Sequence, residues 1–547
     1  MKTGKFSPFL FIIPLFILAW GFFSLYFFAP FYAYSPDPDY CYLLNGLNVS
    51  LLEFNRIGHL DHPGTTFQVY CGMIIRITHF FTGKDAIAQD VINRPEYFLS
   101  AISISLFFLQ AFLCFLIAWV GKKREINTWQ LIILQSGVLF NVTMLSVLHR
   151  IIPERWIIIV SLLFIIIYLL YGYKDRHPLK FAIWSGVIMG MGMATKFNYL
   201  PIIFLPFFLT NSNKNRLIYA TTGIASFFFF MIPVIKKIRY FSDFIIAIAT
   251  HDGIYGGGEK RMFDPERVKT GFVQIFDLTP TLAFLIFAIV TAIIVAIIYK
   301  KKYNTNRQIL LFSGILFVVL LQMIMVAKHF NSYYMLPLIT IYPFILLIFD
   351  DFVQEMGGRK KWTLLPVILF FIIFISFTTK QTFFELQSEK RSRIERKIEL
   401  QFVSDNLPAN TLWFVDPSWQ RAPYVENGII FGLHYIHWPI YYFVELMNKN
   451  SNLISYNSSE ETALIWHGRQ IIIDSVVVTG TPIHLYSTEG RITGTLMEIL
   501  KKAAQRNDVN LNIDTIFSNH KLNSHIIVMQ NLYSHKEWKA EEFISLE

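Results

Sequence analysis

Charged residues are scarce in this chain of 547 residues. They make up 16% of the sequence, against about a quarter in soluble proteins, while hydrophobic residues make up 54%. The 54 Phe and a mean hydropathy of +0.44 indicate a chain in contact with membrane lipid. A formal net charge of +10 would favour nucleic-acid binding in a soluble protein. In a membrane protein the same charge is set by topology, and we expect no nucleic-acid partner.

Cysteine is also rare. Cys41, Cys71 and Cys114 are too few for a disulfide-dense scaffold or a cysteine-based zinc cluster. Cys41 and Cys71 fall in one predicted outer loop, so a disulfide between them stays open. The sequence lacks internal repeats, low-complexity segments and a Gly/Ser-rich linker. The stretch IYGGGEK at 254–260 lacks the preceding strand and the Ser or Thr of a phosphate-binding loop, so it predicts a flexible loop that could act as a lid.

Long apolar runs fill the first 380 residues. A helix needs about 20 apolar residues to cross a bilayer. We predict eleven such segments: 8–30, 98–120, 129–147, 156–171, 181–195, 198–209, 217–235, 279–299, 308–327, 334–349 and 363–378. The first is too long for a signal peptide, and no cleavage site follows it. Residues 181–209 have basic loops at both ends, which favours a hairpin turning at ATKFNY over the alternative of one tilted helix.

The orientation follows from Lys and Arg in the short loops. The basic segments are the amino terminus, GKKREINT, GYKDRHPLK, TNSNKNR, KKKYNTNR and DDFVQEMGGRKKW, with 17 Lys and Arg against 5 acidic residues. We predict that they are cytoplasmic. Three large outer elements result: 31–97, 236–278 and a tail, 380–547. The chain is therefore predicted to be an integral membrane protein, in a bacterial inner or plasma membrane, with a membrane domain at 1–379 and an outer domain at 380–547.

The tail mixes helix and strand signals. A charged helical stretch, QSEKRSRIERKIELQFVSDNL, precedes the strand-like runs TLWFVD, QIIIDSVVVTG and SHIIVMQ and an amphipathic helix at TGTLMEILKKAAQR. This alternation predicts a small α/β domain.

The first outer loop opens with the sequence PDPDY. Asp37 and Asp39 alternate with Pro36 and Pro38, whose fixed φ ends the preceding helix and would hold the carboxylates at the membrane surface. A polar turn leaving the bilayer is the plainer interpretation.

The same loop continues with Asp61, His62 and Pro63, which precede the run TTFQVYCGMIIRITHFF. Its helical spacing of apolar residues, with a few polar interruptions, predicts a helix lying at the membrane interface. An acid beside a His can bind an anion or a metal ion. Two residues are too few for a metal site, so a second acid such as Asp39 would have to converge with them.

Three further outer tips carry charges. HRIIPERW contains Glu154 and Arg155, ATKFNY contains Lys196, and KHFNSYYMLP contains Lys328 and His329. Surface ion pairing or snorkelling to lipid headgroups would explain each of them alone. If they converge on one side, they suit transfer from a polyprenyl-phosphate-linked donor. Such a donor needs an apolar groove, cations or a metal ion for its phosphate, and a carboxylate that deprotonates the acceptor hydroxyl.

At these residues the chain resembles the GT-C membrane glycosyltransferases, in particular the branch of the protein O-mannosyltransferases and the bacterial lipid A aminoarabinose transferases. Five segments in the same order carry the resemblance: PDPDY, LDHPGT, HRIIPERW, GMGMATKFNYLP and KHFNSYYMLP. It implies a GT-C fold, a polyprenyl-phosphate-sugar donor, an extracytoplasmic acceptor and inversion at the anomeric carbon. The chain departs from the family's usual Asp-Glu at Asp39-Tyr40, and from its frequent Lys-Pro-Pro at His62-Pro63-Gly64.

The resemblance also implies roles for single residues. Asp39 would be the general base, with Asp37 as the alternate, and Asp61 and Glu154 would bind the acceptor or a divalent cation, Mg²⁺ or Mn²⁺. The residues that would bind the donor phosphate are His62, Arg155, Lys196, Lys328 and His329.

Two other classes of protein stay open. A transporter or flippase would favour charges in mid-span and repeated halves, which this sequence lacks. The paired outer carboxylates argue against a non-catalytic scaffold or a polysaccharide polymerase. The sequence does not specify the sugar or the acceptor.

Overall fold

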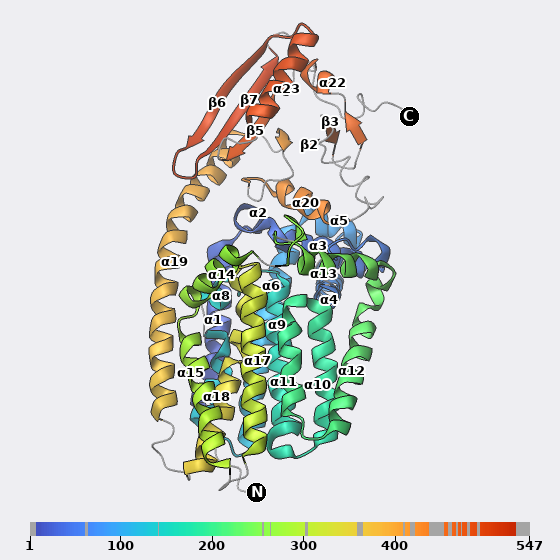
Figure 1. Ribbon diagram of the computed structural model, residues 1–547. Coiled ribbons are helices and arrows are strands. Elements are labelled where there is room, and N and C mark those ends of the chain that lie inside the picture. The colour runs from blue at the N-terminus through green and yellow to red at the C-terminus, as the bar shows by residue number, and fades with distance from the viewer. Residues whose placement is uncertain are drawn as a thin grey trace. The chain divides into compact units, whose positions relative to one another are not determined.

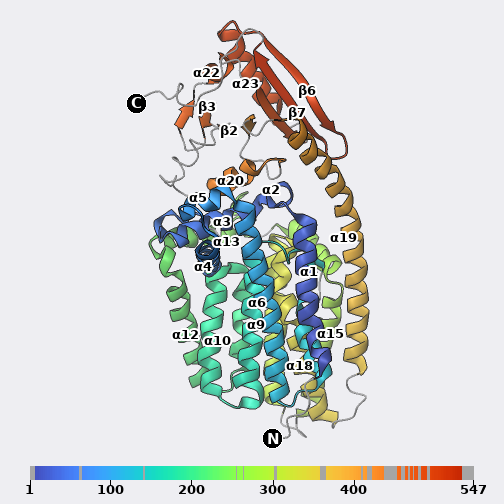
Figure 2. The same ribbon diagram turned by 180° about the vertical axis from the view of Figure 1, so that it is seen from behind.

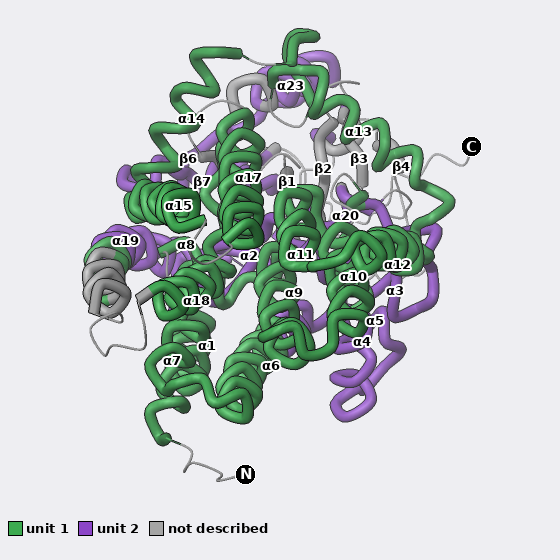
Figure 3. Tube along the Cα trace, turned by 60° about the horizontal axis from the view of Figure 1, so that its bottom comes forward, with its two compact units in different colours: residues 1–26, 59–70, 103–383 green, residues 27–58, 71–102, 384–547 purple. Residues whose placement is uncertain are grey.

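The computed structural model describes residues 7–60, 64–139, 142–253, 256–262, 264–300, 305–357, 365–407, 411–415, 422–436, 453–457, 462–465, 469–471, 473–478, 482–488 and 493–531. Contacts divide the chain into two compact units, coloured in Figure 3, and each is described by itself. Unit 1 comprises residues 1–26, 59–70 and 103–383, and unit 2 comprises 27–58, 71–102 and 384–547. Unit 2 thus combines much of the first predicted outer loop with the tail. The predicted domain division at residue 379 rests on membrane topology and stays a prediction.

Unit 1 is built from helices, and its long helices run side by side in Figures 1 and 2. Together with the three helices that it shares with unit 2, α1, α4 and α6, the elements are η1 Pro8–Phe11, α1 Ile12–Phe28, α4 Thr65–Thr82, α6 Pro95–Lys123, α7 Thr128–Gln135, η3 Ser136–Leu139, α8 Val142–Ser146, α9 Pro153–Ile167, η4 Tyr168–Gly172, η5 Tyr173–Asp175, α10 Pro178–Thr195, η6 Phe197–Ile203, α11 Phe204–Leu209, α12 Asn213–Met231, η7 Ile232–Lys237, α13 Ile238–Thr250, α14 Pro265–Leu278, α15 Thr281–Ile298, α17 Asn306–Lys328, η9 Ser332–Met335 and α18 Leu336–Gly357. Helix α19, Leu365–Asn406, leads from unit 1 into unit 2.

Seven helical segments among the described residues are long and apolar enough to cross a membrane. They are Pro8–Phe28, Pro95–Lys123, Pro153–Asp175, Asn213–Thr250, Thr281–Ile298, Asn306–Lys328 and Ser332–Met356. Large apolar side chains on them are exposed, such as Phe287 at 72% and Ile298 at 69%. Apolar surface of this extent is covered by lipid in membrane proteins. The chain therefore has the architecture of a polytopic helical membrane protein.

The other four predicted spans take different forms. The described part of residues 129–147 is divided into α7, η3 and α8, and the Gln135 side chain at the end of α7 donates hydrogen bonds to the Leu10 and Cys114 carbonyls, at 3.0 and 2.8 Å. Of the predicted span 363–378, the described residues from Leu365 on form the start of α19. The segment 181–209 is broken at Lys196, whose backbone is extended, so α10 ends there and η6 and α11 follow. The predicted break at ATKFNY is confirmed, and the single tilted helix is wrong.

Unit 2 begins with short helices from the first predicted outer loop. They are α2 Phe31–Tyr34, α3 Pro36–Ser50, η2 Phe54–Arg56 and α5 Ile87–Asn93. The predicted helix in TTFQVYCGMIIRITHFF is confirmed as α4. Cys41 and Cys71 are both buried thiols, so the disulfide that the sequence left open is not formed. Their predicted loop is folded into helices. Cys41 lies in α3 and Cys71 lies in α4, and both side chains are buried.

The described residues of the tail form a seven-stranded sheet in the order β4-β3-β2-β1-β5-β7-β6. Its elements are β1 Leu412–Val415, α20 Val425–His434, β2 Leu453–Asn457, β3 Thr462–Ile465, β4 Arg469–Ile471, α22 Ile473–Val478, β5 Ile483–Thr488, α23 Thr493–Arg506, β6 Leu511–Asn519 and β7 Ser524–Asn531. Strand β1 pairs in parallel with β2 and β5, and the remaining pairs are antiparallel. The predicted α/β character, helix α23 and strands β1 and β7 are confirmed.

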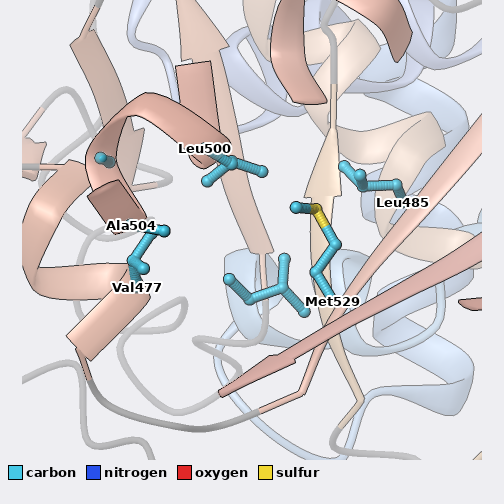
Figure 4. Close-up of a cluster of buried hydrophobic side chains, with 7 residues drawn as sticks. Val477, Leu485, Leu500, Ala504 and Met529 are labelled. Carbon is cyan, nitrogen blue, oxygen red and sulfur yellow. The ribbon is translucent and has the colours of Figure 1, made fainter. Parts of the chain in front are cut away.

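Packing overrides strand propensity at one place in the tail. The predicted strand QIIIDSVVVTG is wrong in its second half, because residues 473–478 form helix α22. Val477 of α22 is buried in a cluster with Leu500 and Ala504 of α23 and with Leu485 and Met529 of the sheet (Figure 4). Burial of Val477 in this cluster outweighs the local preference of valine for strands.

A buried polar network joins α19 to the sheet. Arg396 Nη1 donates to Glu399 Oε2 and to the Tyr486 hydroxyl, each at 2.5 Å, and Ser524 Oγ donates to Glu399 Oε1. Burial raises the pKa of Tyr486 to about 12, so its hydroxyl stays neutral. Because each charge has an opposite partner, this network holds the helix against β5 and β7.

Candidate functional site

A buried ion pair lies where α9 begins and α10 ends. Lys196 Nζ donates to Glu154 Oε1, and the two residues are 4% and 2% exposed. The Lys196 ammonium also lies over the rings of Tyr334 and Tyr333, 4.8 and 5.5 Å from their centroids. One carboxylate and two aromatic faces therefore compensate the charge of a lysine removed from water.

The segment that follows Asp61 and His62 is tied to the same place. The Gly64 N–H donates to the Thr195 carbonyl at 2.9 Å, and the Thr66 and Thr195 hydroxyls are hydrogen-bonded at 2.6 Å. Gly64 has φ +60°, a left-handed conformation that favours glycine. Thr195 directly precedes Lys196 in the chain, so these bonds hold the start of α4 against the end of α10.

Aromatic side chains join α4 to α9 close to these residues in the chain. Trp156, in the first turn of α9, lies 4.6 Å from Tyr70 and 6.1 Å from Phe67 between ring centroids. The Tyr70 hydroxyl donates to Ser105 Oγ at 2.9 Å. Four of the five segments singled out in the sequence thus meet within unit 1, through Gly64, Glu154, Lys196 and Tyr334. We call these four residues, together with Thr66, Thr195 and Tyr333, the Lys196 cluster.

Arg155 joins α9 to α6 and to the segment before α9 through hydrogen bonds. It is fully buried and donates to the Arg150 carbonyl at 2.9 Å and to the Ser103 hydroxyl and carbonyl, each at 3.4 Å. The Ser103 hydroxyl in turn donates to the His149 carbonyl at 2.7 Å. Burial and the nearby Arg150 and Arg155 lower the pKa of His149, so this ring is neutral at pH 7. These contacts join the tip before α9 to α6.

Lys328 and His329, at the end of α17, contact the last turn of α13. Lys328 Nζ donates to the carbonyls of Ile248 and Ala249, at 2.6 and 3.0 Å. A cation at the carboxyl end of a helix binds its last carbonyls and complements the helix dipole. Burial lowers the pKa of His329, and the adjacent Lys328 ammonium lowers it further. His329 is therefore an uncharged ring at pH 7.

The glycine-rich loop predicted as flexible is closed by hydrogen bonds in its described part. Asp252 accepts from the Glu259 N–H at 3.0 Å and pairs with Arg261, whose guanidinium lowers the pKa of this carboxyl. The Gly253 N–H donates to the Gly257 carbonyl at 2.8 Å. Gly256 and Gly258 have φ of +80° and +79°, which explains the glycines.

Asp37 and Asp39 belong to unit 2. Asp37 and Pro38 interrupt the helical backbone of α3, and Asp39 is fully buried directly after them. Glu96 lies close enough to Asp39 for their charges to interact. Glu96 accepts from the N–H groups of Phe31 and Tyr32, at 2.7 and 3.1 Å, and from the Tyr40 hydroxyl at 2.8 Å.

Sequence reasoning missed Glu96. An acid after Pro95 in the first turn of a helix is common at any helix start, so nothing in the pattern marked it as special. Only the fold places it beside PDPDY.

The structure brings predicted site residues together within unit 1. There it joins Glu154 to Lys196, whereas in unit 2 the predicted Asp39 lies near Glu96, which was not predicted. Asp61 and His62 lie outside the described residues. Among the residues that the structure describes, no group of three or more His, Cys, Asp and Glu is placed to hold a metal ion.

A polar cavity of about 470 Å³ lies at the other end of α9. Glu154 is in the first turn of α9 and Tyr168 of the cavity directly follows it, which separates the two sites by roughly 20 Å at 1.5 Å per residue. The charged and tyrosine side chains that line the cavity are Glu125, Asp175, Asp351, Glu355, Lys174, Arg307, Tyr168 and Tyr173. The basic segments contain five acidic residues, and four of them, all except Asp350, line this cavity.

Comparison of the chain with family models, with curated proteins and with solved structures finds no match.

Proposed function

We propose that the chain is an inverting glycosyltransferase with a GT-C fold and eleven membrane spans, which moves a sugar from a polyprenyl-phosphate-linked donor to an extracytoplasmic acceptor. The observation that carries the proposal is the Lys196 cluster. Residues from four segments, spread from Gly64 to Tyr334, meet there around a buried cation. A buried cation that borders lipid-facing helices suits a ligand with a phosphate head and an apolar tail.

In the proposed reaction, Asp39 and Lys196 each have one role. Asp39 takes the proton of the acceptor hydroxyl, and the oxygen attacks the anomeric carbon from the face opposite the phosphate. The bond between that carbon and the phosphate oxygen breaks, so polyprenyl phosphate leaves and the product is inverted. Lys196 compensates the charge that develops on the leaving phosphate.

Glu154 takes part through Lys196 in this proposal. It holds the ammonium until the phosphate arrives and shares it afterwards, which keeps the buried cation compensated throughout the reaction. Because Lys196 donates to Oε1 of Glu154, a metal ion at this carboxylate would compete with the lysine for that oxygen. A role for Mg²⁺ or Mn²⁺ with Asp61 stays a prediction, and no step depends on it.

Transfer by the purified protein tests the proposal. The full chain in lipid nanodiscs is given undecaprenyl phosphate carrying radiolabelled mannose, glucose or aminoarabinose, together with an envelope extract as the acceptor source. We expect one donor to release undecaprenyl phosphate with its label moving to acceptor. Lys196→Ala should lower this rate at least about 100-fold, because it removes the charge opposite the leaving group. Wild-type rates in Lys196→Ala would contradict the role of the cluster.

A second candidate function is transport of a small cationic solute or flipping of a lipid-linked one. The polar cavity beyond α9 favours it, because four carboxylates and two cations line a hollow at the end of apolar helices. Proteoliposomes separate the two functions: a transporter moves intact labelled solute across the bilayer, whereas a transferase moves label from donor to acceptor on one side.

A further inference from the structure

Tyr40 is held at three points, directly beside Asp39 in the chain. It is fully buried, and its hydroxyl donates to Glu96 Oε1 at 2.8 Å. Its ring and its backbone carbonyl both face α20, a helix from the tail of unit 2. Helix α3, which carries Tyr40, lies beside α20 in Figures 1 and 2.

Helix α20 approaches Tyr40 through two glycines four residues apart. A Cβ on Gly428 would lie 2.5 Å from Tyr40 Cζ, and a Cβ on Gly432 would lie 2.7 Å from the Tyr40 carbonyl oxygen. Both distances are shorter than any real Cβ contact, so the two helices touch at the glycines and a larger residue would force them apart. The spacing of Gly428 and Gly432 puts both on one face of α20.

Glu96 fixes the other side of Tyr40. Its carboxylate also accepts from two backbone N–H groups at the start of α2, so the acceptor for the Tyr40 hydroxyl is itself held in place. The backbone before Asp39 is not helical at Asp37 and Pro38. Asp39 is followed directly by Tyr40, so the contacts that hold Tyr40 also hold the backbone on the carboxyl side of Asp39.

We infer that Glu96 and α20 are positioning groups that act through Tyr40 to hold Asp39. The tail then contributes to the active site by packing against the motif that carries the base. This inference rests on the proposed function, in which Asp39 takes the acceptor proton. It adds what the tail does in that reaction.

Cys41, the residue after Tyr40, reports on the packing independently of activity. Its thiol is fully buried, so it should react slowly with N-ethylmaleimide. The reaction is followed in the full chain carrying Cys71→Ser and Cys114→Ser. We expect Gly428→Ala and Gly432→Ala to speed alkylation of Cys41 about tenfold, because each methyl pushes α20 away from α3.

Kinetics then separate positioning from stability. In the transfer assay both glycine variants should lower kcat at least about tenfold with KM for the donor within about twofold, because a displaced base slows the chemical step alone. Tyr40→Phe keeps the ring but loses the bond to Glu96, so it should lower kcat while Cys41 stays protected. The matched control for the glycine variants is Gly223→Ala, because the nearest atom to a Cβ there is the Gly186 carbonyl oxygen at 3.6 Å. The matched control for Tyr40→Phe is Tyr342→Phe, which loses the hydrogen bond to the Thr281 carbonyl.

Three results would overturn the inference. Unchanged alkylation in both glycine variants would show that α20 does not pack on Tyr40. Faster alkylation with wild-type kcat would show that the packing does not position the base. A fall in kcat as large in Tyr342→Phe as in Tyr40→Phe would assign the effect to stability. If the wild-type chain transfers no sugar, the proposed function fails, while the alkylation rates still decide whether α20 packs on α3.

Discussion

Lys196 and Glu154 form a pair in which each residue depends on the other. Both are almost completely buried, so neither charge is solvated by water when its partner is removed. The rings of Tyr333 and Tyr334 compensate only part of the lysine's charge, because a cation–π contact is weaker than a buried ion pair.

Single and double substitutions of this pair should differ in stability. Lys196→Gln and Glu154→Gln should each lower the free energy of unfolding by about 3 kcal/mol, because each leaves one buried charge uncompensated. The double variant should recover part of that loss, since neither charge remains. Unfolding of the detergent-solubilised protein measures this. Additive losses in the double variant would show that the two residues are not coupled.

His329 should make stability depend on pH. Burial and Lys328 lower its pKa in the folded chain, while the unfolded value is about 6.5. Between these two values the unfolded chain binds a proton that the folded chain does not. The free energy of unfolding is therefore not reduced by His329 above about pH 6.5, and it falls as the pH falls below that value. The Tm of His329→Gln should therefore fall less than that of the wild type between pH 7.5 and 5. An equal fall in Tm for the wild type and His329→Gln would show that His329 does not cause the pH dependence.

At the scale of elements, α10 and α12 pack through glycines. A Cβ on Gly190 would lie 2.6 Å from the Gly223 carbonyl oxygen and 2.7 Å from the Phe227 backbone nitrogen. Backbone atoms cannot rotate away from an added methyl group as a side chain can. The close approach holds the end of α10, and with it Lys196, in place.

Gly190→Ala should therefore destabilise the protein by about 1–3 kcal/mol, because overpacking displaces the two helices. Gly223→Ala, on the facing helix, should be tolerated, because its nearest contact is 3.6 Å away. Thermal unfolding of both variants makes the comparison. Equal loss of stability in the two would mean that the helices do not pack as described.

The elements also show how far sequence reasoning reaches. Apolar runs predicted the long helices, because a lipid-facing helix needs an uninterrupted apolar surface. Residues 129–147 do not form one long helix in their described part, and Gln135 there bonds to carbonyls of other helices. Strand β5 and Glu96 were missed for a shared reason: the pairing of β5 with β1 and β7, and the bond from Tyr40 to Glu96, join residues far apart in the chain. Lys196 and Glu154 were predicted as candidate site residues, because charged residues are easily recognised between apolar segments.

At the scale of the whole molecule, the Lys and Arg residues gathered in the short basic segments predict an orientation. The basic segments should face the cytoplasm and the tail should lie outside. A membrane-impermeant maleimide should label His520→Cys in intact cells, but Lys214→Cys only after the membrane is opened. The three native cysteines are buried and give little background. Labelling of Lys214→Cys in intact cells would reverse the predicted orientation.

Transfer of labelled sugar by variants of the two aspartates decides whether Asp39 is the catalytic base. Wild type, Asp39→Asn and Asp37→Asn are compared at saturating undecaprenyl-phosphate sugar in nanodiscs. If Asp39 is the base, Asp39→Asn lowers kcat at least about 100-fold, because an amide cannot take the acceptor proton, and Asp37→Asn keeps most of the wild-type rate. Wild-type transfer by both variants would contradict the account.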